Sequence, residues 1–151
     1  MAGLQASAVI FPNMELKAKY DRFWMNLDIH RNNAVSSVAM ETAFNEGEEW
    51  LEQLLVYISG NFDFIKDYCE KYIPQIHQCS GRYLSGMLDC RELGMSNEEL
   101  SRFMVEKAGL GLSDGYTFGR SLSGYMRLNA ACPRSVLKQA LEQLRAAVEA
   151  L

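Results

Sequence analysis

The sequence predicts an α/β fold, and three observations support that prediction. Strand and helix patterns alternate after Ile73, in the order β-α-β-β-α. A long helical pattern precedes them, with apolar residues at every third or fourth position. The 151 residues are 48% apolar and 23% charged, which is typical of a globular protein that buries a substantial core.

The first part of the chain is predicted to hold one strand and two helices. Residues 7–11, SAVIF, favour a short strand because they are β-prone and are followed by the turn signal Pro12-Asn13. Large apolar side chains then recur at helical spacing from Met14 to about Asp28. A second helix is expected over residues 34–44.

A long amphipathic helix is expected from about Glu48 to Tyr72. Pro74 disfavours helical geometry in the residue before it and so ends the pattern. Gly60 lies in the middle of this helix and lowers its propensity, which predicts a bend or a close contact with another element. The apolar positions of the pattern are Trp50, Leu51, Leu54, Leu55, Ile58, Phe62, Ile65, Cys69 and Tyr72.

Shorter elements follow this helix. Residues 83–91, YLSGMLDCR, are strand-like, although Ser85-Gly86 interrupts them. Ser96 and Glu99 have the spacing of a capping box and predict the start of a helix, which Gly109 is expected to end.

The last part of the chain is predicted to be two strands and a helix. Residues 110–119, LGLSDGYTFG, indicate a strand and a turn, and residues 124–130 alternate as a strand does. The final helix is expected to begin at Pro133, because proline suits a first helical turn. Its apolar face consists of Val136, Leu137, Ala140, Leu141, Leu144, Val148 and Leu151.

Charge and cysteine content exclude several classes of protein. A formal net charge of −4 without a basic cluster argues against nucleic acid or an anionic membrane as the partner. The apolar run near the start is too short to span a membrane and lacks the positive charges of a signal peptide. The four cysteines show no CxxC spacing and favour a reducing compartment, so we expect a cytoplasmic protein.

No metal site and no thiol nucleophile is predicted. His77 and Cys79 are close in sequence and Cys69 is near, but they lack the paired ligand spacing of a zinc site. The cysteines have no histidine partner in sequence. His30 is interpreted as a surface or capping histidine, and the glycines of residues 109–119 lack the spacing of a phosphate-binding loop.

Arg127 is the residue whose surroundings best suit ligand binding. In an alternating strand Tyr125, Arg127 and Asn129 share one face. An arginine on such a polar face can hold a carboxylate through two parallel hydrogen bonds. From spacing alone, however, a surface arginine in a weak ion pair is the preferred interpretation.

Four runs of the sequence resemble a known family. They are MAGLQASAVIFPN, ETAFNEGEEWLEQLLVYISGN, LDCRELGMSNEELSRFMVEKAGLGLSDGYTFG and GYMRLNAACPRSVLKQALEQL. Together they look like the C-terminal part of pyridoxal-phosphate (PLP) enzymes of the aspartate-aminotransferase fold. Within that fold they most resemble the MalY/PatB branch, which comprises cystathionine β-lyases and cysteine-S-conjugate β-lyases.

The resemblance implies an organisation and an activity. Residues 1–46 would be a remnant of the large PLP-binding domain, residues 47–73 a long connecting helix, and residues 74–151 a small C-terminal α/β domain. The family cleaves cystathionine or a cysteine S-conjugate into a thiol, pyruvate and ammonia. It also implies PLP as cofactor, a small amino-acid substrate and a homodimer.

The cofactor-binding lysine is not among the lysines of this chain. The family carries it in a run similar to S-x-S-K-T-F-N-[LM]-A-G-L, whose end matches residues 1–4, so the lysine would precede Met1. We therefore expect a fragment that is inactive alone. The lysines present, none in a matching context, are Lys17, Lys19, Lys66, Lys71, Lys107 and Lys138.

Two residues acquire roles from the resemblance. Arg127 matches the arginine that binds the substrate α-carboxylate in the wider fold. Gln5 falls where aminotransferases often place a phosphate-binding arginine, so it is either a cofactor contact or a plain surface residue. A glutamine at that position favours a lyase over an aminotransferase.

One departure from the family affects a strand near the active-site entrance. The family usually reads Y-L-x-W-L-D before this segment's Cys90-Arg91, whereas this chain reads YLSGMLD, one residue longer and without the tryptophan. One extra residue reverses every side chain beyond it unless a bulge absorbs it.

The alternatives to a lyase fragment are a non-catalytic α/β module that binds a carboxylate ligand or a partner protein, and a fragment of a class I/II aminotransferase.

Overall fold

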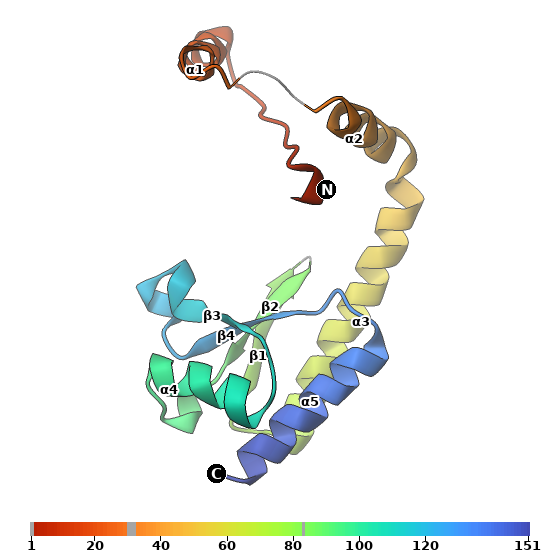
Figure 1. Ribbon diagram of the computed structural model, residues 1–151. Coiled ribbons are helices and arrows are strands. Elements are labelled where there is room, and N and C mark those ends of the chain that lie inside the picture. The colour runs from red at the N-terminus through yellow and green to blue at the C-terminus, as the bar shows by residue number, and fades with distance from the viewer. Residues whose placement is uncertain (1, 30–32, 83) are drawn as a thin grey trace. The chain divides into compact units, whose positions relative to one another are not determined.

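The chain forms two compact units. The computed structural model describes residues 2–29, 33–82 and 84–151, so His30 lies outside the described residues. The first unit comprises Met1–Glu52 and the second comprises Gln53–Leu151 (Figure 1). The predicted division into residues 1–46, 47–73 and 74–151 remains a prediction, and the two units are described separately below.

The first unit contains the two predicted helices. Helix α1 spans Met14–Asn26 and α2 spans Ala34–Glu46, so α1 ends slightly earlier and α2 slightly later than the patterns indicate. Each begins at an asparagine whose side-chain oxygen accepts a backbone N–H of the first turn. Asn13 Oδ1 lies 2.9 Å from the Leu16 nitrogen, and Asn33 Oδ1 lies 2.9 Å from the Val35 nitrogen.

The strand predicted over residues 7–11 is wrong. This segment has no regular structure, and Ile10 is 93% exposed. A strand needs a neighbouring strand for its backbone hydrogen bonds. The described part of the first unit contains no other strand, so β-propensity alone does not form one here.

Helix α3 spans Glu48–Tyr72, as its apolar pattern predicts. The predicted close contact at Gly60 is present. A Cβ atom added at Gly60 would lie 3.3 Å from the guanidinium of Arg134, the first residue of the last helix. The glycine therefore leaves room for an arginine side chain against the helix.

A four-stranded antiparallel sheet forms the centre of the second unit (Figure 1). Its strands are β1 (His77–Arg82), β2 (Ser85–Asp89), β3 (Ser113–Asp114) and β4 (Tyr125–Asn129), in the order β1-β2-β4-β3. The predicted β-α-β-β-α order omits β1. Its residues, HQCSGR, show no apolar alternation, and β1 lies at the edge of the sheet, where pairing with β2 alone decides its structure.

Two further helices complete the second unit. Helix α4 spans Asn97–Arg102 and continues as a π-helical turn over Phe103–Lys107. The predicted capping box joins Ser96 and Glu99. Gly109, at φ +66°, ends this helix in the left-handed conformation that glycine favours. Helix α5 spans Arg134–Glu149, directly after Pro133.

One face of the sheet packs on the helices and the other is open. Leu88, Met126 and Leu128 point to the packed face and are at most 5% exposed. They share one core with residues of three helical segments, namely Ile58, Phe62, Ile65 and Cys69 of α3, Leu100 and Met104 of α4 and its π-helical turn, and Leu137, Leu141 and Leu144 of α5. The strand residues that alternate with these point to the open face of the sheet, where they can contact a ligand.

The extra residue before Cys90 does not reverse the direction in which the side chains of β2 point relative to those of β4. All five residues of β2 pair with β4 in one unbroken register, from Ser85 opposite Asn129 to Asp89 opposite Tyr125. The irregularity lies instead between β1 and β2, where the register shifts between Cys79 and Arg82. The edge strand absorbs the irregularity, so β2 keeps its facing relative to β4.

Asn61 links α3 to the segment that leaves β4. Its side chain is 0% exposed, and its Nδ2 donates to the carbonyl oxygens of Ala130 at 2.7 Å and Cys132 at 3.0 Å. Its Oδ1 accepts from Arg134 Nε at 2.7 Å. The backbone N–H of Arg134 donates to the Tyr57 hydroxyl at 2.8 Å, so a second α3 residue holds the start of α5.

Replacing Asn61 with alanine should strongly destabilise the second unit. The change leaves a buried carbonyl oxygen of Ala130 without its partner, and we expect a loss of roughly 2–4 kcal/mol in the free energy of unfolding. Urea denaturation of the whole chain measures this loss. Asp63→Ala, an exposed substitution on the same helix, should change the free energy by less than about 0.5 kcal/mol. Equal effects of the two substitutions would contradict the role assigned to Asn61.

Candidate functional site

The open face of the sheet carries a row of four side chains across all four strands. Cys79 of β1 lies opposite Met87 of β2, Met87 lies opposite Arg127 of β4, and Arg127 lies opposite Ser113 of β3. Residues that are directly opposite in a sheet point to the same face. The register therefore brings together residues that are up to 48 positions apart in sequence, a separation given by Cys79 and Arg127.

Arg127 presents an exposed guanidinium in this row. Its Nη2 donates to Ser113 Oγ at 3.3 Å, and its Cζ lies 4.7 Å from the ring centre of Phe118. Phe118 ends a 3-10 turn, Gly115–Phe118, that follows β3 directly. Among the described residues no carboxylate forms an ion pair with Arg127. The guanidinium is therefore held by a hydroxyl and a ring, and its charge has no fixed counter-charge.

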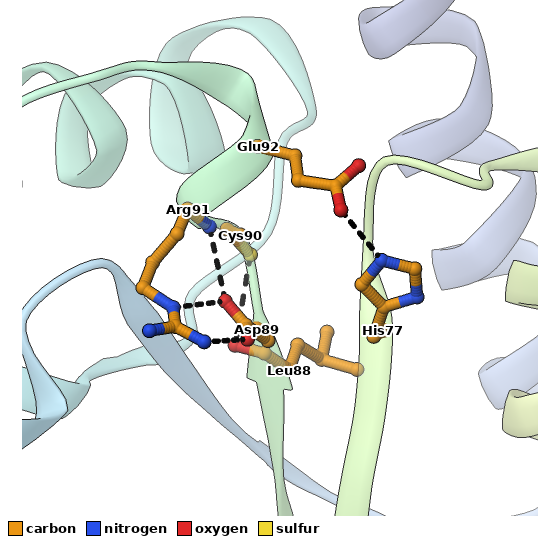
Figure 2. A network of polar contacts seen from close by, with 6 residues as sticks. All are labelled: His77, Leu88, Asp89, Cys90, Arg91 and Glu92. Atoms are coloured by element: carbon orange, nitrogen blue, oxygen red, sulfur yellow. Dashed lines mark hydrogen bonds and ion pairs between the residues drawn. The ribbon is translucent and has the colours of Figure 1, made fainter.

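The LDCR segment builds a polar network at the end of β2 (Figure 2). Arg91 Nε and Nη2 donate to the two carboxylate oxygens of Asp89 at 2.9 and 2.6 Å, and the backbone N–H of Arg91 donates to Oδ1 at 3.2 Å. The side-chain hydrogen bond from Arg91 is the main reason that the pKa of Asp89 falls to about 2. In the same view His77 Nε2 lies 3.1 Å from a carboxylate oxygen of Glu92.

This network holds the start of β4, the strand that carries Arg127. The Arg91 guanidinium lies 5.0 Å from the ring centre of Tyr125, and the Cys90 backbone N–H donates to the Gly124 carbonyl at 3.0 Å. Gly124 has φ +79°, and a Cβ atom there would lie 2.6 Å from Arg91 Cγ. Two segments that are far apart in sequence, LDCR and GYMR, thus pack on each other through a glycine.

Burial raises the pKa of three cysteine thiols of this unit. Cys69 and Cys90 are buried, and burial raises the pKa of Cys69 to about 11 and that of Cys90 to about 12. Burial also raises the pKa of Cys79. These thiols stay protonated near neutral pH, which agrees with the expectation that they are not nucleophiles.

Gln5 lies in the first unit, directly after a 3-10 turn that spans Ala2–Leu4. It is exposed and has φ +50°, a left-handed backbone conformation that is uncommon for a residue other than glycine. The structure thus gives Gln5 an unusual backbone, and its cofactor contact remains a prediction.

Four of the six lysines form ion pairs with nearby acids. They lie on helical segments, where Lys19, Lys66 and Lys138 pair with glutamates four residues away and Lys17 pairs with Asp21. No group of three or more metal-ligating side chains occurs in the described ranges. None of the described helices combines the length and apolar character needed to cross a bilayer.

Ser113 and Phe118 are the site residues that sequence reasoning missed. The pattern of residues 110–119 indicates only a strand and a turn. Ser113 becomes a neighbour of Arg127 through the β3–β4 register, and Phe118 does so through the turn after β3. The available signal was a large apolar residue, Phe118, among the glycines of a predicted turn; the structure leaves it 52% exposed.

Asp89 should contribute to stability in a pH-dependent way. Asp89→Asn is expected to lower the free energy of unfolding by about 1 kcal/mol near pH 7, a modest loss because Arg91 is exposed to solvent and salt. The folded-state pKa of Asp89 lies below the unfolded value, so this contribution is full above about pH 5 and is lost as the pH falls towards 2. Urea denaturation at pH 7, 5 and 3 should show the gap to the native chain shrinking. A gap that is constant with pH, or a similar trend for exposed Glu106→Gln, would contradict this assignment.

Comparison with curated proteins gives a consistent set of relatives, although no protein-family model matches the sequence. The chain is 32% identical over 150 residues to cystathionine beta-lyase PatB of Bacillus subtilis strain 168, covering 98% of this chain and 38% of that protein. It is 31% identical over 110 residues to protein MalY of Escherichia coli K12, covering 72% of this chain and 28% of that protein.

Solved structures give the same result. A PLP-bound protein from Clostridium difficile 630, provisionally described as an aminotransferase, matches 97% of this chain and 38% of its own at 38% identity, with a TM-score of 0.92. A PLP-bound C–S lyase from Staphylococcus hominis, in complex with L-cycloserine, matches 98% of this chain and 36% of its own at 28% identity, with a TM-score of 0.84.

These relationships confirm the predicted family and fold. The chain covers between 28% and 39% of the length of the curated relatives that it matches, 38% in the case of PatB. Within that share, the alignment to PatB covers 98% of this chain, and the solved structure from Clostridium difficile has the same fold over 97% of it. The chain belongs to the PatB/MalY-type family of PLP-dependent C–S lyases with the aminotransferase fold, and it corresponds to one segment of such a protein.

Proposed function

We propose that the chain supplies the substrate-carboxylate site of a PLP-dependent C–S β-lyase. The substrate would be cystathionine or a cysteine S-conjugate, which reacts with water to give a thiol, pyruvate and ammonia. The observation that supports this proposal is the exposed guanidinium of Arg127, which lies on an open sheet face without a carboxylate partner among the described residues.

Arg127 suits this role for a chemical reason. A guanidinium is planar and remains charged, so it binds a carboxylate through two parallel hydrogen bonds. Fixing the carboxylate fixes the orientation of the adjacent Cα–H bond, and such positioning is a large contribution to catalysis. In this chain the arginine carries out binding and orientation, and it transfers no proton.

The cofactor must be held mainly by other residues. PLP supplies the electron sink of the family's chemistry when it is bound. The lysines described above lie on helix surfaces and do not fit a Schiff-base site, so we assign no reaction step to this chain alone. The lysine and most of the cofactor site would come from polypeptide beyond these 151 residues, with Gln5 as a proposed contact to the cofactor.

The wider context of the protein is also a proposal. The composition and the family favour a cytoplasmic enzyme that works as a homodimer. An aminotransferase of the same fold is the second candidate, because the Clostridium difficile relative is provisionally described as one. Release of thiol and pyruvate identifies a lyase, whereas amino transfer to a 2-oxo acid identifies an aminotransferase.

The isolated chain should not catalyse C–S cleavage. Purified chain mixed with PLP and cystathionine is expected to form no pyruvate, because the chain has no lysine in a suitable position. The measurements are pyruvate release and the visible absorption of a lysine-bound cofactor. Turnover together with that absorption band would refute the proposal.

The isolated chain should nevertheless bind amino-acid carboxylates at Arg127. We would titrate L-cystathionine into chain labelled with ¹⁵N-arginine and follow the side-chain N–H signals by NMR. Arg127→Met should weaken binding by roughly tenfold or more, because a charged two-bond contact is lost. Arg127→Lys should recover only part of the affinity, since lysine cannot bind a carboxylate bidentately.

Two controls make this measurement specific. Arg120→Met removes another exposed arginine of the same region and should leave affinity within about twofold, a change too small to represent a lost ion pair. An analogue of cystathionine that lacks both carboxylates should not shift the Arg127 signals. Equal weakening by the two arginine substitutions, or no binding by the native chain, would contradict the assigned role of Arg127.

A further inference from the structure

We infer that Phe118 and Ser113 are positioning residues that hold the Arg127 guanidinium in one orientation and leave one carboxylate-binding edge open. This inference rests on the proposed function, because it specifies how Arg127 receives its carboxylate. It concerns two residues outside the β4 strand, and three features of the structure support it.

The first feature is the hydrogen bond from Arg127 to Ser113. A guanidinium offers two edges that bind a carboxylate bidentately, and both include one hydrogen of Nη2. Nη2 donates one hydrogen to Ser113 Oγ at 3.3 Å, which uses one edge. The other Nη2 hydrogen and the neighbouring nitrogen remain free among the described residues. Ser113 therefore occupies one edge and leaves the second available.

The second feature is the stacking of Arg127 on Phe118. The guanidinium carbon lies 4.7 Å from the ring centre, within the range of a cation–π contact. Phe118 is 52% exposed, so the ring gains little from burial in the core. A ring this close blocks approach from its own side and leaves fewer directions from which a carboxylate can reach the guanidinium.

The third feature is the rigid turn that carries Phe118. A Cβ atom added at Gly115 would lie 2.6 Å from the carbonyl oxygens of both Leu122 and Tyr125, so the turn lies directly against the start of β4. Thr117 Oγ1 donates to the Asp114 carbonyl at 2.6 Å and closes the turn. The turn thus places the ring at a fixed position relative to the strand that carries Arg127.

Holding the side chain in advance should increase affinity. A free arginine side chain loses rotamer entropy when a ligand immobilises it. A guanidinium that is already held by a ring and a hydroxyl loses less, so more of the hydrogen-bond energy appears as binding.

The test uses the full 151-residue chain and two NMR measurements. A stacked ring should shift the Arg127 side-chain protons upfield, and Phe118→Leu should abolish that shift while Phe118→Trp keeps it. In the cystathionine titration, Phe118→Leu and Ser113→Ala should each weaken binding roughly two- to fivefold, as expected for loss of one such contact. Phe118→Trp should restore native affinity, which a merely structural role would not predict.

Tyr116→Leu is the matched control, because Tyr116 is a 42% exposed ring on the same turn. It should change neither the Arg127 shift nor the affinity. If the native chain binds and the Phe118→Leu and Ser113→Ala variants bind equally well, this inference is overturned and the proposed function stands. If the upfield shift is present but the native chain binds no carboxylate, the proposed function fails and the held orientation of Arg127 stands. Absence of both signals overturns both.

Discussion

The site depends on the pairing of β4 with a strand on each side. This pairing places Met87 on one side of Arg127 and Ser113 on the other, all on the open face of the sheet. A shift of one residue would turn Arg127 into the core and leave a buried charge without a partner, which is strongly unfavourable. The register is therefore both the structural and the functional constraint of this unit.

Two sets of contacts maintain that register at the ends of β4. At its start, Arg91 and Asp89 form a charged network beside Tyr125, and Gly124 allows Arg91 to lie against the backbone. After its end, Asn61 of α3 holds the segment that leads into α5. Polar contacts fix the ends, and apolar residues on the packed face hold the middle.

The chain combines a supported, exposed arginine with lysines that lie on helical segments. Arg127 contacts a hydroxyl and a ring, whereas four of the lysines form ion pairs with acids four residues away on the same helix. Under the proposed function, this segment would supply carboxylate binding and the rest of the protein would supply most of the chemistry. The binding property is thus the one that can be measured on this chain.

The sequence by itself determined the helices and the family, and it singled out Arg127 as a candidate site residue. Helices form from local hydrogen bonds and a repeating apolar face, so α3, α4 and α5 were predictable from their patterns and capping residues. Tertiary structure alone decided β1, the irregular structure of residues 7–11, and the two supports of Arg127. Strands and cross-strand contacts depend on partners that are distant in sequence, and only the folded chain brings those partners together.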